Sequence, residues 1–234
     1  MESISKRIKS TLPNLTERII DTDLFLEELQ LPNSKKRAAL RELSRLEASN
    51  ELVRISKGVY AKNEVSQITK KNKPVSDREI VRYYTKDNEG LLVGYDLYNQ
   101  RNISTQISKK KTVFSSRLKK ESRNVKAITV KKVDMAITEK NKLYIEVLEI
   151  IENSNAIQDF NNRGFFKLME EFVGRYDIQT MTYILNNLSY KKQTIFNLNK
   201  ILEKFGKESG LERYLNATSR YKVNKAYEAV STQR

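Results

Sequence analysis

The residues of this sequence best suited to chemistry are arginines and lysines that recur at helical spacing. Arg37, Arg41 and Arg45 are four residues apart, so a helix would place their guanidinium groups along one side. A guanidinium group can donate two parallel hydrogen bonds to a guanine edge, and Arg37 and Arg41 lie nearest the helix start. Three residues that suit phosphate contacts directly precede this stripe, namely Ser34, Lys35 and Lys36.

An isolated charged stripe is most often the solvated outer face of a helix. The neighbouring segments must therefore decide whether this stripe is such a face or contacts nucleic acid. The opposite side of this helix carries, at 100° per residue, Ala39, Leu40, Leu43, Leu46 and Glu47. We expect the helix to follow Pro32 with Asn33 or Ser34 as its cap. Its apolar side would then pack on two earlier helices, over residues 3–9 and 21–29.

A short hairpin follows the striped helix. Residues 50–62 read NELVRISKGVYAK, in which apolar and polar side chains alternate on both sides of Gly58. The two apolar residues that we expect to pack on the helices are Val53 and Ile55. Arg54 would point the other way, and Lys57 would lie at the tip. A striped helix, a turn and a basic hairpin in this order favour a winged helix-turn-helix that binds DNA.

Two windows of the chain hold nearly all of the net charge of +15. Residues 33–62 carry a net charge of +5, and residues 101–135 carry +9. The second window contains a predicted second basic surface, made of Lys109, Lys110, Lys111, Arg117, Lys119, Lys120 and Arg123. Three interpretations stay open for it: a phosphate-binding surface, a surface for an acidic protein or RNA, or basic loops that protect sheet edges.

Several classes of protein are disfavoured by what the sequence lacks. It contains neither cysteine nor histidine, which removes disulfides, the usual zinc and haem ligands and histidine-activated nucleophiles. Its carboxylate clusters, at residues 146–152 and 170–171, fall on apolar helices, so we predict no enzyme activity, no metal and no cofactor. Without a long apolar run or a signal peptide, we expect a cytoplasmic protein with no membrane contact.

We predict an α+β fold that is mostly helical, with an N-terminal winged helix-turn-helix, a mixed α/β central block and a C-terminal helical region. The winged helix-turn-helix would occupy residues 1–63, followed by a polar linker over 64–76. A second domain would cover residues 77–234, mixed α/β over 77–153 and helical over 154–234. No internal repeat is evident.

Local signals place the elements of the second domain. Ser76 and Glu79 have the spacing of a capping box, which predicts a helix from residue 77. Gly206 is a suitable C-terminal end for the last predicted helix. The expected helices cover residues 77–84, 94–99, 140–153, 163–176, 178–188 and 194–206, and the expected strands lie within 110–116 and 125–133.

Three segments of the sequence resemble one protein family. Residues 39–62 read ALRELSRLEASNELVRISKGVYAK, residues 94–120 read GYDLYNQRNISTQISKKKTVFSSRLKK, and residues 214–223 read YLNATSRYKV. Together they resemble the AbiE-type abortive-infection antitoxins, whose wing has a basic strand followed by Gly-(Val/Ile)-Tyr. The central segment is similar to the family's Leu-(Ser/Thr)-Thr-Gln stretch, from which position 103 departs, with Ile where the family has Leu.

The resemblance implies an antitoxin of a two-gene toxin–antitoxin system. Such a protein represses its own operon by binding double-stranded operator DNA, and it counters a nucleotidyltransferase-like toxin. The toxin, or the RNA on which the toxin acts, is then a further partner. The resemblance marks Arg37, Arg41, Arg45, Arg54, Lys57, Gly58, Gly94, Tyr95, Thr105, Gln106, Ser116 and Arg117. The alternative is an interaction module for nucleic acid or an acidic protein, without a toxin partner.

Overall fold

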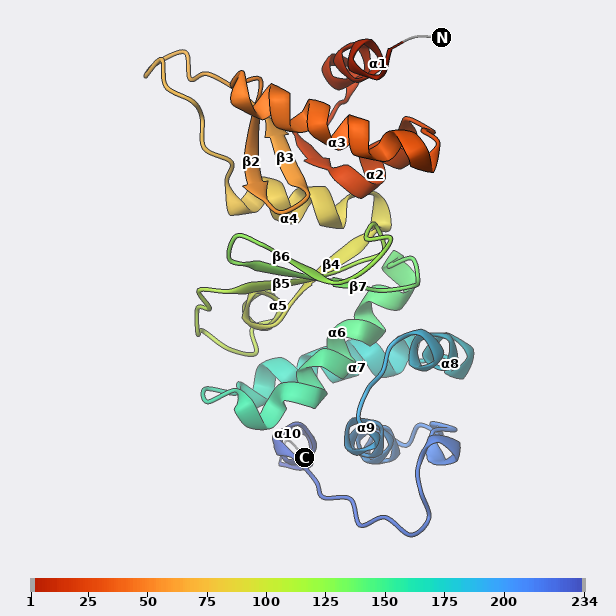
Figure 1. Ribbon diagram of the computed structural model, residues 1–234. Coiled ribbons are helices and arrows are strands. Elements are labelled where there is room, and N and C mark those ends of the chain that lie inside the picture. Colours follow the sequence, from red (N-terminus) through yellow and green to blue (C-terminus); the bar gives the residue numbers. More distant parts are fainter. Residues whose placement is uncertain (1–2, 233–234) are drawn as a thin grey trace.

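The computed structural model describes residues 3–232, which form layers that follow the order of the chain (Figure 1). Helix accounts for 51% and strand for 13% of the structure, in ten helices and two small sheets over the residues described. The predicted α+β, mostly helical fold class is therefore confirmed. Among residues 3–232, no helix is both long enough and apolar enough to cross a membrane.

The N-terminal layer has the element order of a winged helix. Its elements are α1 (Ile4–Thr11), β1 (Ile19–Asp21), α2 (Thr22–Glu28), α3 (Asn33–Ala48), β2 (Leu52–Ser56) and β3 (Val59–Lys62). Strand β3 lies between β1 and β2 and is antiparallel to both. The three helices pack on one face of this sheet around buried side chains such as Phe25, Leu43 and Tyr60.

The central layer is a four-stranded sheet with two helices. Its elements are α4 (Asp77–Thr85), β4 (Gly90–Val93), α5 (Tyr95–Gln100), β5 (Lys111–Ser115), β6 (Arg123–Val125) and β7 (Ile128–Lys132). The strand order is β4-β5-β7-β6, with β5 and β7 parallel. The strand expected within 125–133 is confirmed as β7, whereas the short strand β6 before it was not predicted. Lys126 has a φ of +53°, which turns the chain back between β6 and β7 and makes a hairpin.

The C-terminal layer is helical. Its helices are α6 (Glu139–Asn153), α7 (Asn162–Arg175), α8 (Ile178–Asn187), α9 (Lys192–Lys204) and α10 (Lys225–Ser231). Gly206, with a φ of +70°, ends α9 as predicted, and its N–H donates to the Glu203 carbonyl. Helix α10 was not predicted, because its buried residues are two alanines and one valine, a weak apolar signal.

Helix α4 joins the N-terminal and central layers. It begins with the predicted capping box, in which Ser76 and Glu79 bond each other's backbone N–H groups. Its buried residues, among them Ile80 and Tyr84, share one apolar cluster with β3 and with the central sheet. The sheet face of the winged helix opposite α3 is therefore covered by α4 and the central layer, whereas α3 itself is not covered by them.

Candidate nucleic-acid interface

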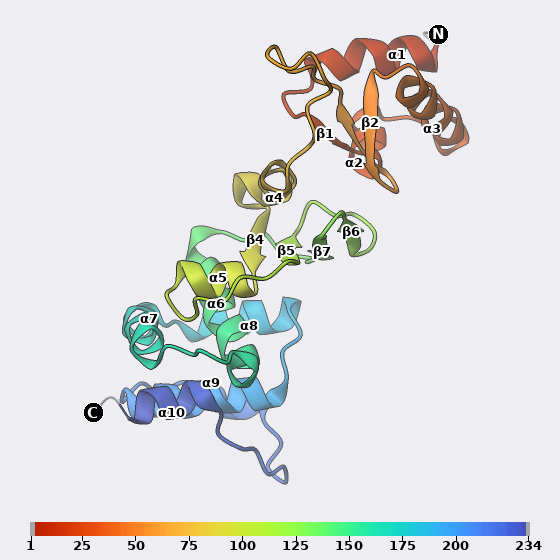
Figure 2. The ribbon, with the colours of Figure 1, turned by 90° about the vertical axis from the view of Figure 1, so that its left-hand side faces the viewer.

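Helix α3 presents the predicted arginine stripe to solvent. Ser34, Arg37 and Arg41 are exposed, and the side chains of the two arginines make no ion pair or hydrogen bond within residues 3–232. Arg45 is also exposed, but it pairs with Glu42 at 3.3 Å. Figure 2 shows α3 on the opposite side of the N-terminal sheet from α4. Two guanidinium groups therefore stand on an open helix face.

The buried face of α3 is narrower than predicted. Ala39, Leu43 and Leu46 are buried in the N-terminal core as expected, but Leu40 is 43% exposed. Leu40 lies roughly 100° around the helix from Ala39, whereas the buried residues fall within about 60° of it. Glu42 occupies the buried side instead, and its carboxylate accepts a hydrogen bond from α1 at 2.7 Å.

The start of α3 also differs from the prediction. The cap residue is Pro32, and neither Asn33 nor Ser34 caps the helix through its side chain. Pro32 has φ −55° and ψ 148°, so the chain turns into the helix one residue earlier than expected. Ser34, Lys35 and Lys36 therefore lie in the first helical turn, with Ser34 exposed and both lysines partly buried.

The hairpin of β2 and β3 forms the wing. Arg54 and Lys57 are exposed, and neither side chain has a polar partner in the described part of the chain. Leu52 packs under the helices, whereas Ile55 packs on the other face against the α4 cluster, so the expected placement of Val53 and Ile55 is wrong. The reason is the register. Arg54 pairs with Tyr60, whose ring faces the helices, and cross-strand partners share a face.

The tip of the wing is fixed against the start of α2. Gly58 has a φ of +74°, and its carbonyl accepts hydrogen bonds from the N–H and the hydroxyl of Thr22, both at 3.0 Å. A Cβ at Gly58 would lie 3.2 Å from that hydroxyl oxygen. Glycine therefore permits both the turn and the close contact, which holds Lys57 in one place.

A groove of about 730 Å³ lies between α3, the wing and the loop that joins β5 to β6. Leu40 lines it from α3, Arg54 and Lys57 from the wing, and Lys120 from the loop. The structure thus brings part of the second basic window beside the winged helix. Sequence reasoning missed this groove, because it placed Leu40 in the core and treated the two basic windows separately.

The seven residues of the predicted second basic surface do not form one surface. Lys119 and Lys120 lie in the loop beside the wing, whereas Lys109 and Lys110 are exposed on a loop away from α3 (Figure 2). Four of the seven are engaged in ion pairs. These pairs are Lys111–Asp96, Arg117–Glu89, Lys120–Asp23, Arg123–Asp21 and Arg123–Asp23. Arg117 also lies over the Tyr83 ring, 4.6 Å from its centroid.

The most buried of these pairs ties the central sheet to the winged helix. Asp21 is 1% exposed, and its carboxylate accepts hydrogen bonds from Arg123 and from the Tyr84 hydroxyl, each at 3.0 Å. Burial raises the pKa of the Asp21 carboxyl, and the Arg123 guanidinium opposes that rise. Arg123 thus neutralises a charge buried between two layers.

The neighbouring carboxylate, Asp23, binds both cations of the loop. Lys120 donates to it at 2.6 Å and Arg123 at 2.8 Å. Burial alone would raise the pKa of Asp23, but the hydrogen bonds from Lys120 and Arg123 outweigh burial and hold that pKa below its usual value. The side chain of Lys120 stays 72% exposed, so the pair positions it in the groove without covering it.

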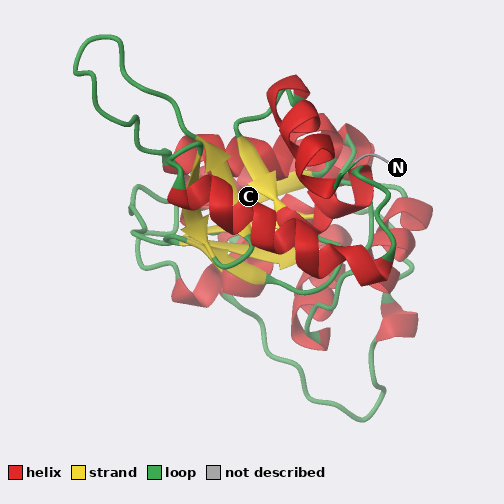
Figure 3. Ribbon diagram, turned by 45° about the horizontal axis from the view of Figure 1, so that its top comes forward, coloured by secondary structure: helices red, strands yellow, loops and turns green. Residues whose placement is uncertain are grey.

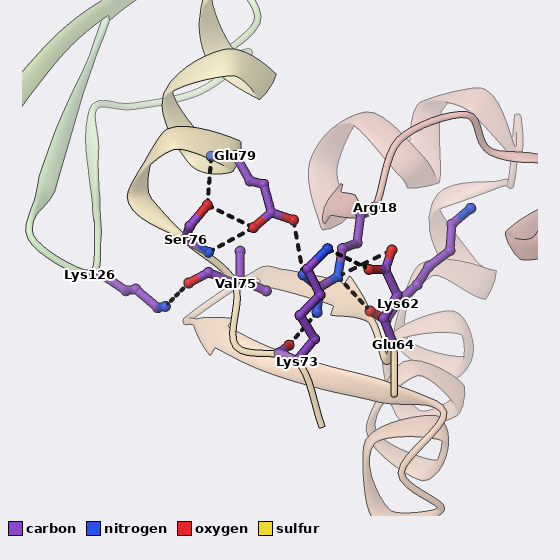
Figure 4. A network of polar contacts seen from close by, with 8 residues as sticks. All are labelled: Arg18, Lys62, Glu64, Lys73, Val75, Ser76, Glu79 and Lys126. Carbon is purple, nitrogen blue, oxygen red and sulfur yellow. Dashed lines mark hydrogen bonds and ion pairs between the residues drawn. The ribbon is translucent and has the colours of Figure 1, made fainter. Parts of the chain in front are cut away.

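A second polar network fixes the angle between the winged helix and α4 (Figure 4). Arg18, 9% exposed, donates to the Lys62 carbonyl at 3.1 Å, to Glu79 at 2.9 Å and to the Lys73 carbonyl. Arg18 also forms an ion pair with Glu64 at 3.6 Å. One arginine thus bridges the N-terminal sheet, both ends of the 64–76 segment and the first turn of α4.

We expect this network to make the fold sensitive to acid. Burial would raise the pKa of Glu79, but hydrogen bonds from Ser76 and Arg18 outweigh it and lower the pKa from 4.5 to about 2. The ionised carboxylate therefore stabilises the native state above pH about 4.5, and this contribution is lost as pH falls toward 2. Thermal unfolding of wild type and Glu79→Gln should differ at pH 6 and converge near pH 2. A difference independent of pH would contradict this.

The groove predicts how binding depends on salt. If Lys57 and Lys120 each contact a phosphate, replacing either one with alanine should weaken binding to all DNA sequences alike. The slope of log affinity against log salt should fall by about 1 for each lysine. Titrations between roughly 50 and 200 mM salt measure this slope. Lys207→Ala, an exposed lysine in the C-terminal layer, is the control and should leave the slope unchanged.

Acidic residues of the C-terminal helices form structural ion pairs at Glu146, Glu152 and Glu171. Glu146 is 3% exposed and accepts from Arg101 at 2.8 Å, and Glu152 pairs with Lys191 at 2.9 Å. Burial raises the pKa of Glu146, which Arg101 opposes. Within residues 3–232, no group of three or more acidic, cysteine or histidine side chains is arranged to hold a metal ion.

Comparisons with known proteins show a distant structural similarity. No family model matches the sequence, and a comparison with curated proteins finds no significant match. Among solved structures, the Rv2827c protein of Mycobacterium tuberculosis is similar to this chain at 13% identity and a TM-score of 0.38. The similarity covers 95% of this chain and 84% of that protein.

Proposed function

We propose that this protein is a DNA-binding repressor that acts as the antitoxin of a two-gene toxin–antitoxin system. The observation that carries the DNA-binding part is the pair of exposed arginines, Arg37 and Arg41, on an open helix beside a basic wing. In this proposal α3 enters the major groove, where Arg37 and Arg41 bond base edges. The antitoxin part rests on the resemblance of residues 39–62, 94–120 and 214–223 to the AbiE-type antitoxins.

The remaining groups of the groove position the DNA. Arg54, Lys57 and Lys120 contact phosphates on either side of α3, and Ser34 with Lys35 and Lys36 contacts phosphate at the helix start. Leu40 is a large apolar residue on the exposed face of α3 and suits the methyl group of a thymine. Phosphate contacts set the register, so sequence preference comes from α3.

The toxin that this antitoxin counters is, in the proposal, a nucleotidyltransferase-like enzyme encoded by the neighbouring gene. Two experiments test the two halves separately. A reporter driven by the DNA upstream of this gene should be repressed by the protein and released by Arg37→Ala with Arg41→Ala. Growth arrest caused by the neighbouring gene product should be relieved by co-expression of the wild-type chain. Persistent arrest would refute the antitoxin role, and an unrepressed reporter would refute the repressor role.

A further inference from the structure

Two exposed loops carry nearly the same six residues. Residues 66–71 read SQITKK, between β3 and α4, and residues 105–110 read TQISKK, between α5 and β5. At each of the six positions the residues are identical or exchange serine for threonine. This repeat is too short to form a structural unit, so it differs from the internal repeats that build a fold.

The two copies also share a local hydrogen bond. In the first loop the Thr69 hydroxyl accepts from the N–H of Lys71 at 3.4 Å, and in the second the Ser108 hydroxyl accepts from the N–H of Lys110 at 3.2 Å. Each bond joins the hydroxyl of the residue after the isoleucine to the N–H two positions on. The copies differ at the next position, because Lys70 has a φ of +54° and its counterpart does not.

Each loop holds an isoleucine almost entirely in solvent. Ile68 is 93% exposed and Ile107 is 91% exposed, the two highest values among the large apolar side chains of the described chain. Both loops project from the same side of the molecule, on the left in Figure 1, and the first stands furthest out in Figure 3. Figure 2 places both away from the exposed face of α3, so a partner there would leave the DNA interface open.

Hydrogen bonds at the base of each loop fix its position, so the tips stay exposed to solvent. In the first loop the N–H of Ser66 donates to the Lys71 carbonyl at 2.9 Å, and Val65 forms a β-bridge with Asn72. In the second loop the hydroxyl and the N–H of Thr105 both donate to Asp159 at 2.7 Å.

The charges beside the isoleucines are not neutralised within the described chain. Lys70, Lys71, Lys109 and Lys110 form no ion pair there, and neither six-residue copy contains an acidic residue. Each tip therefore combines one apolar side chain with two free ammonium groups. The complement of such a tip is an apolar recess bordered by carboxylates.

The composition of the tips favours a protein over nucleic acid or a bilayer. Recognition of single-stranded RNA relies on aromatic side chains that stack on bases, and membrane interfaces favour Trp and Tyr. Neither copy contains an aromatic residue. An isoleucine gains most from burial in a preformed apolar pocket, which a folded protein partner supplies.

We propose that the two SQITKK-type loops are a two-point docking surface for an acidic protein, and that this protein is the toxin. The inference rests on the proposed antitoxin function and adds direct contact between toxin and antitoxin to it. Because both tips belong to one chain, binding of the first raises the effective concentration of the second. The partner face must carry two apolar recesses, each bordered by acidic residues.

The test uses the full-length chain and the purified product of the neighbouring gene, an inactive variant of the protein whose expression arrests growth. Ile68→Ser and Ile107→Ser should each weaken binding at least about 10-fold, and the double variant about 100-fold. Both side chains lie in solvent, so folding and binding to upstream DNA should be unchanged. Val223→Ser, an exposed valine on a C-terminal loop, is the matched control and should bind like wild type.

Each other outcome has a distinct meaning. If the double variant binds the toxin as tightly as wild type, or if it loses affinity for DNA or RNA instead, the docking surface is refuted while the antitoxin role stands. If the wild-type chain relieves growth arrest without binding the toxin, direct contact is refuted. If growth arrest persists with the wild-type chain, the antitoxin function itself fails, and the docking inference fails with it.

Discussion

Replacing Arg37 and Arg41 with alanine will lower the affinity of the protein for its own upstream DNA by about 100-fold or more. Each bidentate contact between arginine and guanine is worth about 1–3 kcal/mol of discrimination, and this variant removes two. Affinity for unrelated DNA will fall much less, because phosphate contacts supply most of the non-specific binding. The ratio of the two dissociation constants, measured at fixed salt, is therefore the informative quantity.

The chain offers a matched control for this variant. Arg78 and Arg82 are also exposed arginines four residues apart, but they lie on α4, on the other side of the N-terminal sheet (Figure 2). Replacing both with alanine removes the same net charge and should leave the specificity ratio unchanged. Equal losses in the two double variants would mean that net charge, rather than the position on α3, governs binding.

Replacing Arg123 with methionine will destabilise the fold by about 3–5 kcal/mol. The substitution leaves the carboxylate of Asp21 buried between two layers without its cation, the most costly way to break a buried pair. For a chain of this size the melting temperature should fall by roughly 10 °C. The loss should shrink at acid pH, because Asp21 can then take up a proton and be buried in its neutral form.

A double-mutant cycle separates the charge pair from packing. Asp21→Asn removes the charge and retains one side-chain oxygen, which can still cap α2, while its amide N–H can donate to the Tyr84 hydroxyl. Combined with Arg123→Met, it should recover much of the lost stability, since no uncompensated charge remains. If Arg123→Met is as stable as wild type, Asp21 does not depend on its cation and the buried pair does not join the layers. If the double variant is as unstable as the single one, lost packing is the cause.

The elements that could be predicted from the sequence are those with local signals. The start of α4 was predictable from Ser76 and Glu79, because a capping box involves only four consecutive residues. The α3 stripe and the wing tip at Gly58 were predictable from helical spacing and from the conformational freedom of glycine. The exposure of the arginines on which the proposed function depends could thus be predicted from the local sequence.

The remainder of the interface depends on contacts between distant segments. Arg123 and Asp21 are 102 positions apart, so no local pattern indicates that one neutralises the other. The placement of Lys120 beside the wing follows from that contact. Leu40 was assigned to the core because the predicted apolar side of α3 covered too large an angle around the helix axis. The spacing of 100° per residue already places Leu40 outside the side that Ala39, Leu43 and Leu46 share.

The proposed organisation separates two activities on one molecule. The α3 face, with Arg37, Arg41 and the groove at Lys120, would bind DNA, and the loops at Ile68 and Ile107 would bind protein. Since α4 covers the other face of the N-terminal sheet, toxin and DNA would occupy different sides of the molecule.

The central claim is sequence-specific binding of DNA by α3, and one measurement tests it most directly. The full-length chain is titrated against the DNA upstream of its own gene and against a scrambled duplex of equal length and composition, at about 150 mM salt. We predict an affinity for the upstream DNA at least about 1,000-fold higher than for the scrambled duplex. Equal affinity for the two duplexes would contradict the account, because charge alone would then explain the binding.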